Sequence, residues 1–286
     1  MDNNHEKREH KRSLKYWEAA KRLNPIDDVM FRKMAENKDF CEEILRAILE
    51  DKNLTVIEAT PQWTGNNLRG RSVILDTKCV IGNGTQIDIE VQKSDNDDHQ
   101  RRVRYNGAVL TTNLTVKGTM FKDIPNVCIV YISRFDVFDD NFSLYHVDRV
   151  VRETRKLVDN GFYEVYVNAK VRDGSDVSEL MEIFTDDSTY NPKFPITSET
   201  KKHYKNDEGG IETMCDIMQE LIDESNAEVR KEGMEEGKKK GRAEEREQII
   251  SQALRSGNSA EAVASFLQLP VEDVKRVKDK MNKVTA

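Results

Sequence analysis

The feature that most restricts the fold of this chain is a pair of alternating stretches within residues 72–93. At residues 73–81 the odd-numbered positions are mostly apolar, whereas the even-numbered positions include Asp76 and Lys78. At residues 86–92 apolar side chains again occupy odd positions and polar ones even positions. Successive side chains of a strand point to opposite faces. Both stretches are therefore predicted to be strands with one apolar and one polar face.

The turn between these strands sets their register. Residues 82–84 read Gly-Asn-Gly, a sequence that favours a tight turn. A two-residue turn would place Asp76 opposite Val91 and mix polar with apolar side chains, whereas a three-residue loop centred on Asn83 places Asp76 opposite Glu90. Because a slip of one residue moves every side chain to the other face, we expect the three-residue loop.

Two acidic side chains are then expected to face each other on the polar side. Directly paired residues have Cβ atoms about 4.5–5.5 Å apart, so Asp76 and Glu90 would repel unless a cation lies between them. Mg²⁺ prefers one or two carboxylates together with water and substrate phosphate. The pattern therefore predicts a divalent-metal site formed by Asp76 and Glu90. The alternative is a polar face exposed to water, on which Lys78 and Asp88 form an ordinary surface ion pair.

The segments around the hairpin predict an α/β domain. Asn24-Pro25 marks a boundary, and a helix from residue 27 or 28 and a second at 39–49, capped by Asn37 or Asp39, are expected after it. After the hairpin we expect the following elements: a helix at 98–114, a strand buried on both faces at 127–132, and strands at 142–147 and 162–171. This order is typical of an α/β domain ending near Val171. With the segment up to the charged connector included, we place the domain at residues 24–200.

Both ends of the chain differ from this domain in composition. Residues 1–23 carry seven Lys or Arg against four acids, which predicts a basic arm. Residues 201–246 are expected to be a charged helical connector in which Gly233, Gly237 and Gly241 either permit close helix pairing in a homo-oligomer or weaken the helix. Residues 247–286 predict a small three-helix unit similar to a helix-turn-helix, acting either on DNA or as an interaction module.

Composition excludes several classes of protein. No apolar run approaches the roughly 18 residues of a membrane helix, and the first residues form no apolar signal region, so we expect a cytoplasmic protein without membrane contact. The four cysteines lie far apart with no CxxC pair, which argues against a disulfide framework and a zinc site. The net charge of −7 argues against a nucleic-acid partner overall but does not locate local patches.

Four short motifs together resemble the PD-(D/E)XK nuclease superfamily, specifically its recombination-promoting nuclease and transposase branch. The first two are an acid at the end of Ile-Leu-Asp (74–76) and, after the hairpin, Ile-Glu-Val-Gln (89–92), with Gln in place of the usual Lys as is common in that branch. Residues 28–32, Asp-Val-Met-Phe-Arg, are similar to its Asp-x-x-Phe-Lys signature. Arg101, Arg104 and Tyr105 are similar to its Arg/Tyr pattern. The likeness covers residues 24–136.

The resemblance implies a mixed central sheet flanked by helices and a metal-dependent DNA endonuclease associated with recombination or mobile elements. By that resemblance Asp76 and Glu90 would ligate Mg²⁺, or Mn²⁺, and Gln92 would take the place of the motif Lys. Gln92 carries no charge and cannot act as a general base. Because the register places Lys78 on the Asp76 face, we expect Lys78 to compensate for it. Asp28 is expected either to reach the metal or to cap its helix.

The predicted helix after the hairpin carries the expected DNA contacts. Arg101 and Arg104 can bind phosphates through bidentate hydrogen bonds, and Tyr105 by stacking or through its hydroxyl. The alternative is that both arginines are ordinary surface residues and Tyr105 lies at the edge of the core.

The sequence leaves two rival functions open. The first is a catalytically inactive nuclease fold that binds DNA or protein, and the second is a regulator or toxin-like component in which the C-terminal helices dominate.

Overall fold

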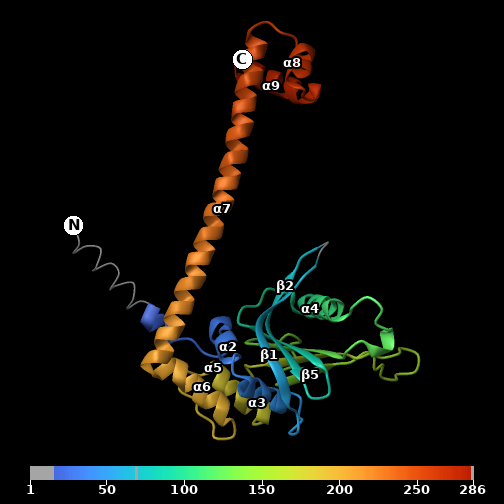
Figure 1. The fold of residues 1–286 in the computed structure, drawn as a ribbon, viewed down its shortest axis with the longest axis vertical. Coiled ribbons are helices and arrows are strands. Elements are labelled where there is room, and N and C mark those ends of the chain that lie inside the picture. Colours follow the sequence, from blue (N-terminus) through green and yellow to red (C-terminus); the bar gives the residue numbers. More distant parts are fainter. Residues whose placement is uncertain (1–15, 68–69, 285–286) are drawn as a thin grey trace, which may run out of the picture. The chain divides into compact units, whose positions relative to one another are not determined.

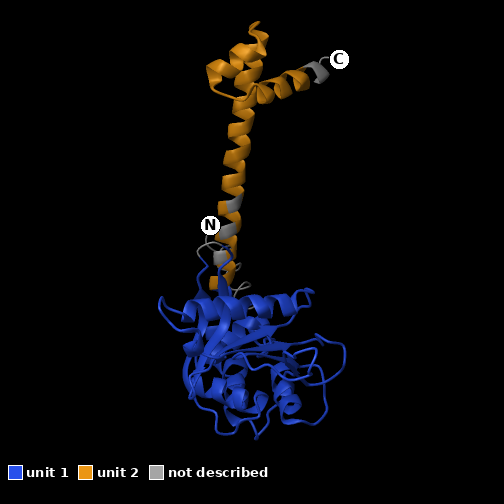
Figure 2. Ribbon diagram, turned by 90° about the vertical axis from the view of Figure 1, so that its right-hand side faces the viewer, with its two compact units in different colours: residues 1–219 blue, residues 220–286 orange. Residues whose placement is uncertain are grey.

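The computed structural model describes residues 16–67 and 70–284 of the chain. It divides into two units, Met1–Gln219 and Glu220–Ala286 (Figure 2). Residues 1–15 of the predicted basic arm lie outside the described residues. Within the described part of the chain, no helix is both long enough and apolar enough to cross a membrane.

The first unit is built on a six-stranded mixed sheet with the order β1-β2-β3-β4-β6-β5 (Figure 1). The strands are β1 (Val56–Gly65), β2 (Val73–Ile81), β3 (Gln86–Gln92), β4 (Val127–Ser133), β5 (Leu144–Val147) and β6 (Phe162–Asn168). β2 runs antiparallel to both of its neighbours, β3, β4 and β6 are mutually parallel, and β5 is an antiparallel edge strand. This mixed sheet confirms the expected fold class.

Helices cover both faces of the sheet (Figure 1). On one face lie α2 (Asp28–Met34), α3 (Lys38–Ile48), α5 (Asp176–Thr185) and α6 (Pro195–Asn206), followed by the start of α7 (Glu208–Arg255). On the other face α4 (His99–Leu114) packs with a second set of buried side chains. The sheet is therefore the middle layer of three, and this explains why β4 is buried along its whole length.

The register of the β2–β3 hairpin is the predicted one. Lys78 pairs with Asp88, and Cys79 pairs with Ile87. The turn is closed by the Ile81 amide, which donates to the Thr85 carbonyl over 3.1 Å. Gly84 sits in the loop with φ +87°, a conformation that a side chain at this position would disfavour. The three-residue loop is thus confirmed.

Four elements of the first unit were not predicted: β1, α5, α6 and the short 3-10 helix η1 (Phe121–Asp123). β1 is an edge strand that contains Pro61, and between its first and last residues the side chains are exposed or only partly buried, so it lacks the alternation that marks a half-buried strand. α5 and α6 follow Val171, near which the α/β layout was expected to end, and they pack against α3. Asn37 caps α3 by accepting a hydrogen bond from the Asp39 amide over 3.0 Å, which decides between the two candidate caps.

The second unit contains the rest of α7 with two further helices, α8 (Ala260–Leu267) and α9 (Val271–Val284). α7 continues through all three glycines of the predicted stripe, and nothing lies within 4 Å of where their Cβ atoms would be. The helices share a small core of buried side chains, namely Ile250, Ala260, Val263, Ala264 and Val274. Ser259 caps α8 by accepting a hydrogen bond from the Ala262 amide over 3.1 Å.

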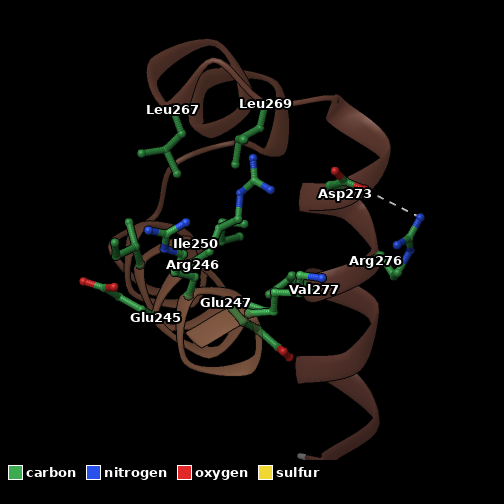
Figure 3. A pocket seen from close by; sticks show the side chains of 13 residues that line it. Glu245, Arg246, Glu247, Ile250, Leu267, Leu269, Asp273, Arg276 and Val277 are labelled. Atoms are coloured by element: carbon green, nitrogen blue, oxygen red, sulfur yellow. Dashed lines mark ion pairs between the residues drawn. The ribbon is translucent and has the colours of Figure 1, made fainter. Parts of the chain in front are cut away.

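A groove of about 880 Å³ lies on the second unit, and its lining combines apolar with charged side chains. Figure 3 shows Ile250, Leu267, Leu269 and Val277 around it. None of the candidate site residues lines this groove, so the chemistry must be sought on the sheet of the first unit.

Candidate active site

The two predicted metal ligands lie side by side where β2 and β3 stop pairing. The regular ladder of these strands ends at Thr77 and Ile89. Beyond it the Asp76 amide donates to Glu90 Oε1 over 3.2 Å, and the Val91 amide donates to Asp76 Oδ2 over 2.9 Å. Both acids are 6% exposed. Side-chain carboxylates thus replace the missing ladder bonds, and their orientation is set by the backbone of both strands.

Helix α2 brings a cation and a further acid to this point. Arg32 donates to Asp76 Oδ1 through Nε at 3.2 Å and Nη2 at 3.0 Å. Its Nε also lies 2.5 Å from Asp28 Oδ1, one helical turn earlier. The cap position of α2 belongs to Asp27, so of the two roles considered for Asp28, that of capping its helix is wrong. Sequence reasoning missed Arg32, although it stands in the motif that contains Asp28.

A fourth carboxylate, Asp88, lies deeper in the same site. Its side chain is fully buried, and Asn106 of α4 approaches Oδ2 with its amide nitrogen at 3.4 Å. Asp88 Oδ1 has no hydrogen-bond partner. The alternative of a water-exposed polar face is wrong, because α4 covers it and leaves Lys78 only 9% exposed. Lys78 Nζ instead lies 5.8 Å from the centroid of the Trp63 ring.

The crowding of acids raises their affinity for protons. Burial raises the pKa of Asp88 to about 8, and the nearby charge of Asp76 acts in the same direction. Burial, followed by the charges of Asp88 and Asp76, also raises the pKa of Glu90. The pKa of Asp28 is raised to about 7 by burial and by Asp76, against the opposing effect of Arg32. If all four acids were ionised, their charge would exceed that of the single guanidinium, so the site favours binding of protons or of a cation.

The donor set fits a hard divalent cation. It consists of carboxylate oxygens, which Mg²⁺ prefers over nitrogen or sulfur, and the unpartnered Asp88 Oδ1 is a buried acceptor that lacks a positive partner. Among residues 16–67 and 70–284, no three His, Cys, Asp or Glu side chains are spaced to hold one ion together. A site of two carboxylates, completed by water and phosphate, is the arrangement these residues support.

Gln92 and the α4 side chains lie near the end of β3. Gln92 donates through Nε2 to the Ser94 carbonyl over 2.6 Å and accepts from Arg102 Nη1 over 3.4 Å. Arg102 also pairs with Asp98 at 3.7 Å. Arg102 was missed because the sequence pattern singles out its neighbours on the helix. Its contact with Gln92 brings a positive charge to the position where the motif usually has Lys.

The three predicted DNA-binding residues differ in their surroundings. Arg101 and Arg104 are exposed on α4. Tyr105, also on α4, is partly buried at the edge of the core, where its hydroxyl donates to the Arg71 carbonyl and accepts from Asn67 Nδ2. The arginines are thus accessible to a ligand, whereas Tyr105 ties α4 to the connection between β1 and β2.

Comparison with known proteins places these features in a family. A family model described as PD-(D/E)XK nuclease family transposase matches residues 25–167. The chain belongs to this family. Searches of curated proteins and of solved structures gave no match. The matched region runs from just before α2 to β6 of this PD-(D/E)XK protein and includes all four carboxylates, and membership supports a nuclease- or transposase-like role.

The buried acids predict an unusual pH dependence of stability. Asp88 has a pKa of about 8 in the folded protein against 3.8 for an ordinary Asp, so the folded state holds an extra proton between these values. The free energy of unfolding should therefore fall as the pH rises from 5 to 8, by up to about 1.4 kcal/mol per pH unit for each such proton. Asp88→Asn removes one titrating group and should flatten this slope.

The measurement is urea unfolding in EDTA at several pH values, followed by the fluorescence of Trp17 and Trp63, which both lie in the first unit. Asp97→Asn, at an exposed position before α4, is the matched control and should keep the wild-type slope. An Asp88→Asn protein with that same slope would contradict the raised pKa.

Proposed function

We propose that this PD-(D/E)XK protein is a metal-dependent DNA endonuclease that hydrolyses phosphodiester bonds, in association with recombination or mobile elements. The observation that carries the proposal is the pair of buried carboxylates, Asp76 and Glu90, joined at the point where two strands diverge. Family membership supports a nuclease- or transposase-like role for the same region. Metal dependence is inferred from the carboxylate donors and their unbalanced negative charge.

Asp76 and Glu90 are the residues that would hold Mg²⁺ or Mn²⁺. Such an ion polarises a phosphoryl oxygen and lowers the pKa of a bound water. The chain's own contribution is to fix the two acids before substrate arrives, since the amides of Asp76 and Val91 each bind one carboxylate. Asp88 lies on the same strand as Glu90 and, together with burial and Asp76, raises the pKa of Glu90. Preorganised groups of this kind need no rearrangement during the reaction.

Two residues are proposed to support this pair. Gln92 is proposed to orient water or phosphate through its amide, which can donate and accept hydrogen bonds but carries no charge. Lys78 is proposed to supply positive charge from the neighbouring rung of the hairpin, where it is held over Trp63. Arg102, which contacts Gln92, is a second source of charge at the same edge.

DNA is the proposed partner of the first unit. Arg101 and Arg104 are exposed on α4, the helix that directly follows the Glu90 strand. Guanidinium groups there can bind phosphate oxygens in bidentate fashion. The second unit is proposed to contact DNA or to mediate self-association through its helices, in view of the α8–α9 pair and the glycine stripe of α7.

A second candidate is a catalytically inactive nuclease fold that binds DNA or protein. Two observations favour it: Arg32 already neutralises Asp76, and the Gln92 amide is engaged by the Ser94 carbonyl. Both candidates predict DNA binding, and only the first predicts cleavage.

Plasmid cleavage separates the two candidates. The full-length protein is expected to nick or linearise supercoiled plasmid with Mg²⁺ or Mn²⁺, and Asp76→Asn or Glu90→Gln should each reduce the rate at least about 100-fold by removing ligand charge. Asp97→Asn should cleave like the wild type. Equal cleavage by all proteins would indicate contamination and contradict the proposal. Lys78→Ala with full activity would exclude the proposed role of Lys78.

The salt dependence of DNA binding tests the α4 arginines. In an Asp76→Asn background, which prevents cleavage, Arg101→Ala and Arg104→Ala should each weaken binding to a short duplex and lower the slope of log K against log salt by about 1. Arg152→Ala, an exposed arginine on the loop that precedes β6, is the control. An unchanged slope in both α4 variants would show that these arginines contact no phosphate.

A further inference from the structure

Arg32 occupies one of the two carboxylate oxygens of Asp76 that could bind a divalent ion. Its Nε and Nη2 both point to Asp76 Oδ1, at 3.2 and 3.0 Å. The other oxygen, Oδ2, accepts from the Val91 amide. A carboxylate oxygen has about two lone-pair positions, so the two Arg32 contacts use those of Oδ1. We propose that Arg32 is an internal cation that competes with the divalent ion for Asp76 and must leave Asp76 when the metal binds. This inference rests on the metal site of the proposed function.

The charges in the site make the two cations mutually exclusive. A guanidinium and a divalent ion on the same oxygen repel each other strongly, because burial limits screening by water. Without Arg32, the carboxylates of Asp28, Asp76, Asp88 and Glu90 would share the site with no guanidinium in contact with Asp76. Arg32 thus stabilises the metal-free protein at the cost of metal affinity.

The structure also provides a position to which Arg32 can withdraw. Asp28 Oδ1 lies 2.5 Å from Arg32 Nε, and the Asp28 side chain is 47% exposed. Arg32 is itself 24% exposed, so it is not sealed inside the core. Arg32 can release Asp76 while keeping its ion pair with Asp28, which lies one turn away on the same helix. The exchange then requires a side-chain movement and leaves helix α2 in place.

The adjacent residue of α2 offers a matched control. Lys33 is also 24% exposed, but it pairs with Glu36 at 2.6 Å and does not contact Asp76. Replacing either residue with Gln removes one positive charge from the same helix. Any difference between the two variants therefore reports the contact with Asp76 and excludes a general effect of net charge.

The test is Mn²⁺ binding to the full-length protein without DNA, measured by isothermal titration calorimetry at fixed pH. Arg32→Gln should lower the Kd for Mn²⁺ by about tenfold or more, equivalent to about 1.4 kcal/mol. Lys33→Gln should stay within about twofold of wild type. Arg32→Lys, which keeps a charge but lacks the two-pronged geometry, should lower the Kd by a smaller factor.

The possible outcomes separate this inference from the proposed function. One outcome overturns the competition but keeps the metal site. In it, Asp76→Asn abolishes Mn²⁺ binding, whereas Arg32→Gln, shown to be folded by circular dichroism, binds Mn²⁺ as the wild type does or more weakly. If Arg32→Gln does not fold, an unchanged Kd in Arg32→Lys overturns the competition. If Asp76→Asn leaves binding unchanged, or neither wild type nor Arg32→Gln binds Mn²⁺, the metal site and the competition both fail. Binding seen only in Arg32→Gln supports the competition.

Discussion

The concentration of negative charge where β2 and β3 separate is the constraint on which the rest of the first unit depends. Asp76 and Glu90 each accept a hydrogen bond from a backbone amide that the strand ladder leaves free. Taking acids out of water is unfavourable unless hydrogen bonds, protons or cations compensate. The surrounding polar side chains are consistent with that requirement, since Arg32 binds Asp76 and Asn106 approaches Asp88. The same imbalance makes the site suitable for a divalent ion.

The hairpin could be predicted from sequence because its information is local. Side-chain alternation has a period of two, and only one turn length keeps both faces uniform, so the pairing of Lys78 with Asp88 follows without knowledge of the rest of the fold. The motif residues of α2 and β3 indicate membership of the PD-(D/E)XK family, and the family-model match to residues 25–167 establishes it.

The features that could not be predicted depend on contacts between segments that lie far apart in the sequence. The burial of the polar face arises from α4, and alternation alone does not tell whether water or a helix covers a strand. Arg32 reaches Asp76 across 44 residues of sequence, so no spacing rule indicates the contact. β1 was missed because its exposed edge position and Pro61 remove the usual signal. Asp88 was placed in the correct register, and its deep burial depends on the same covering helix.

The most direct test of the account is a crystal structure of the protein soaked in Mn²⁺, with the ion located by its anomalous scattering. The account predicts one strong peak in contact with the carboxylates of Asp76 and Glu90, and Arg32 moved away from Asp76 Oδ1. A peak only at other residues, or no peak at a Mn²⁺ concentration that supports DNA cleavage, would contradict it.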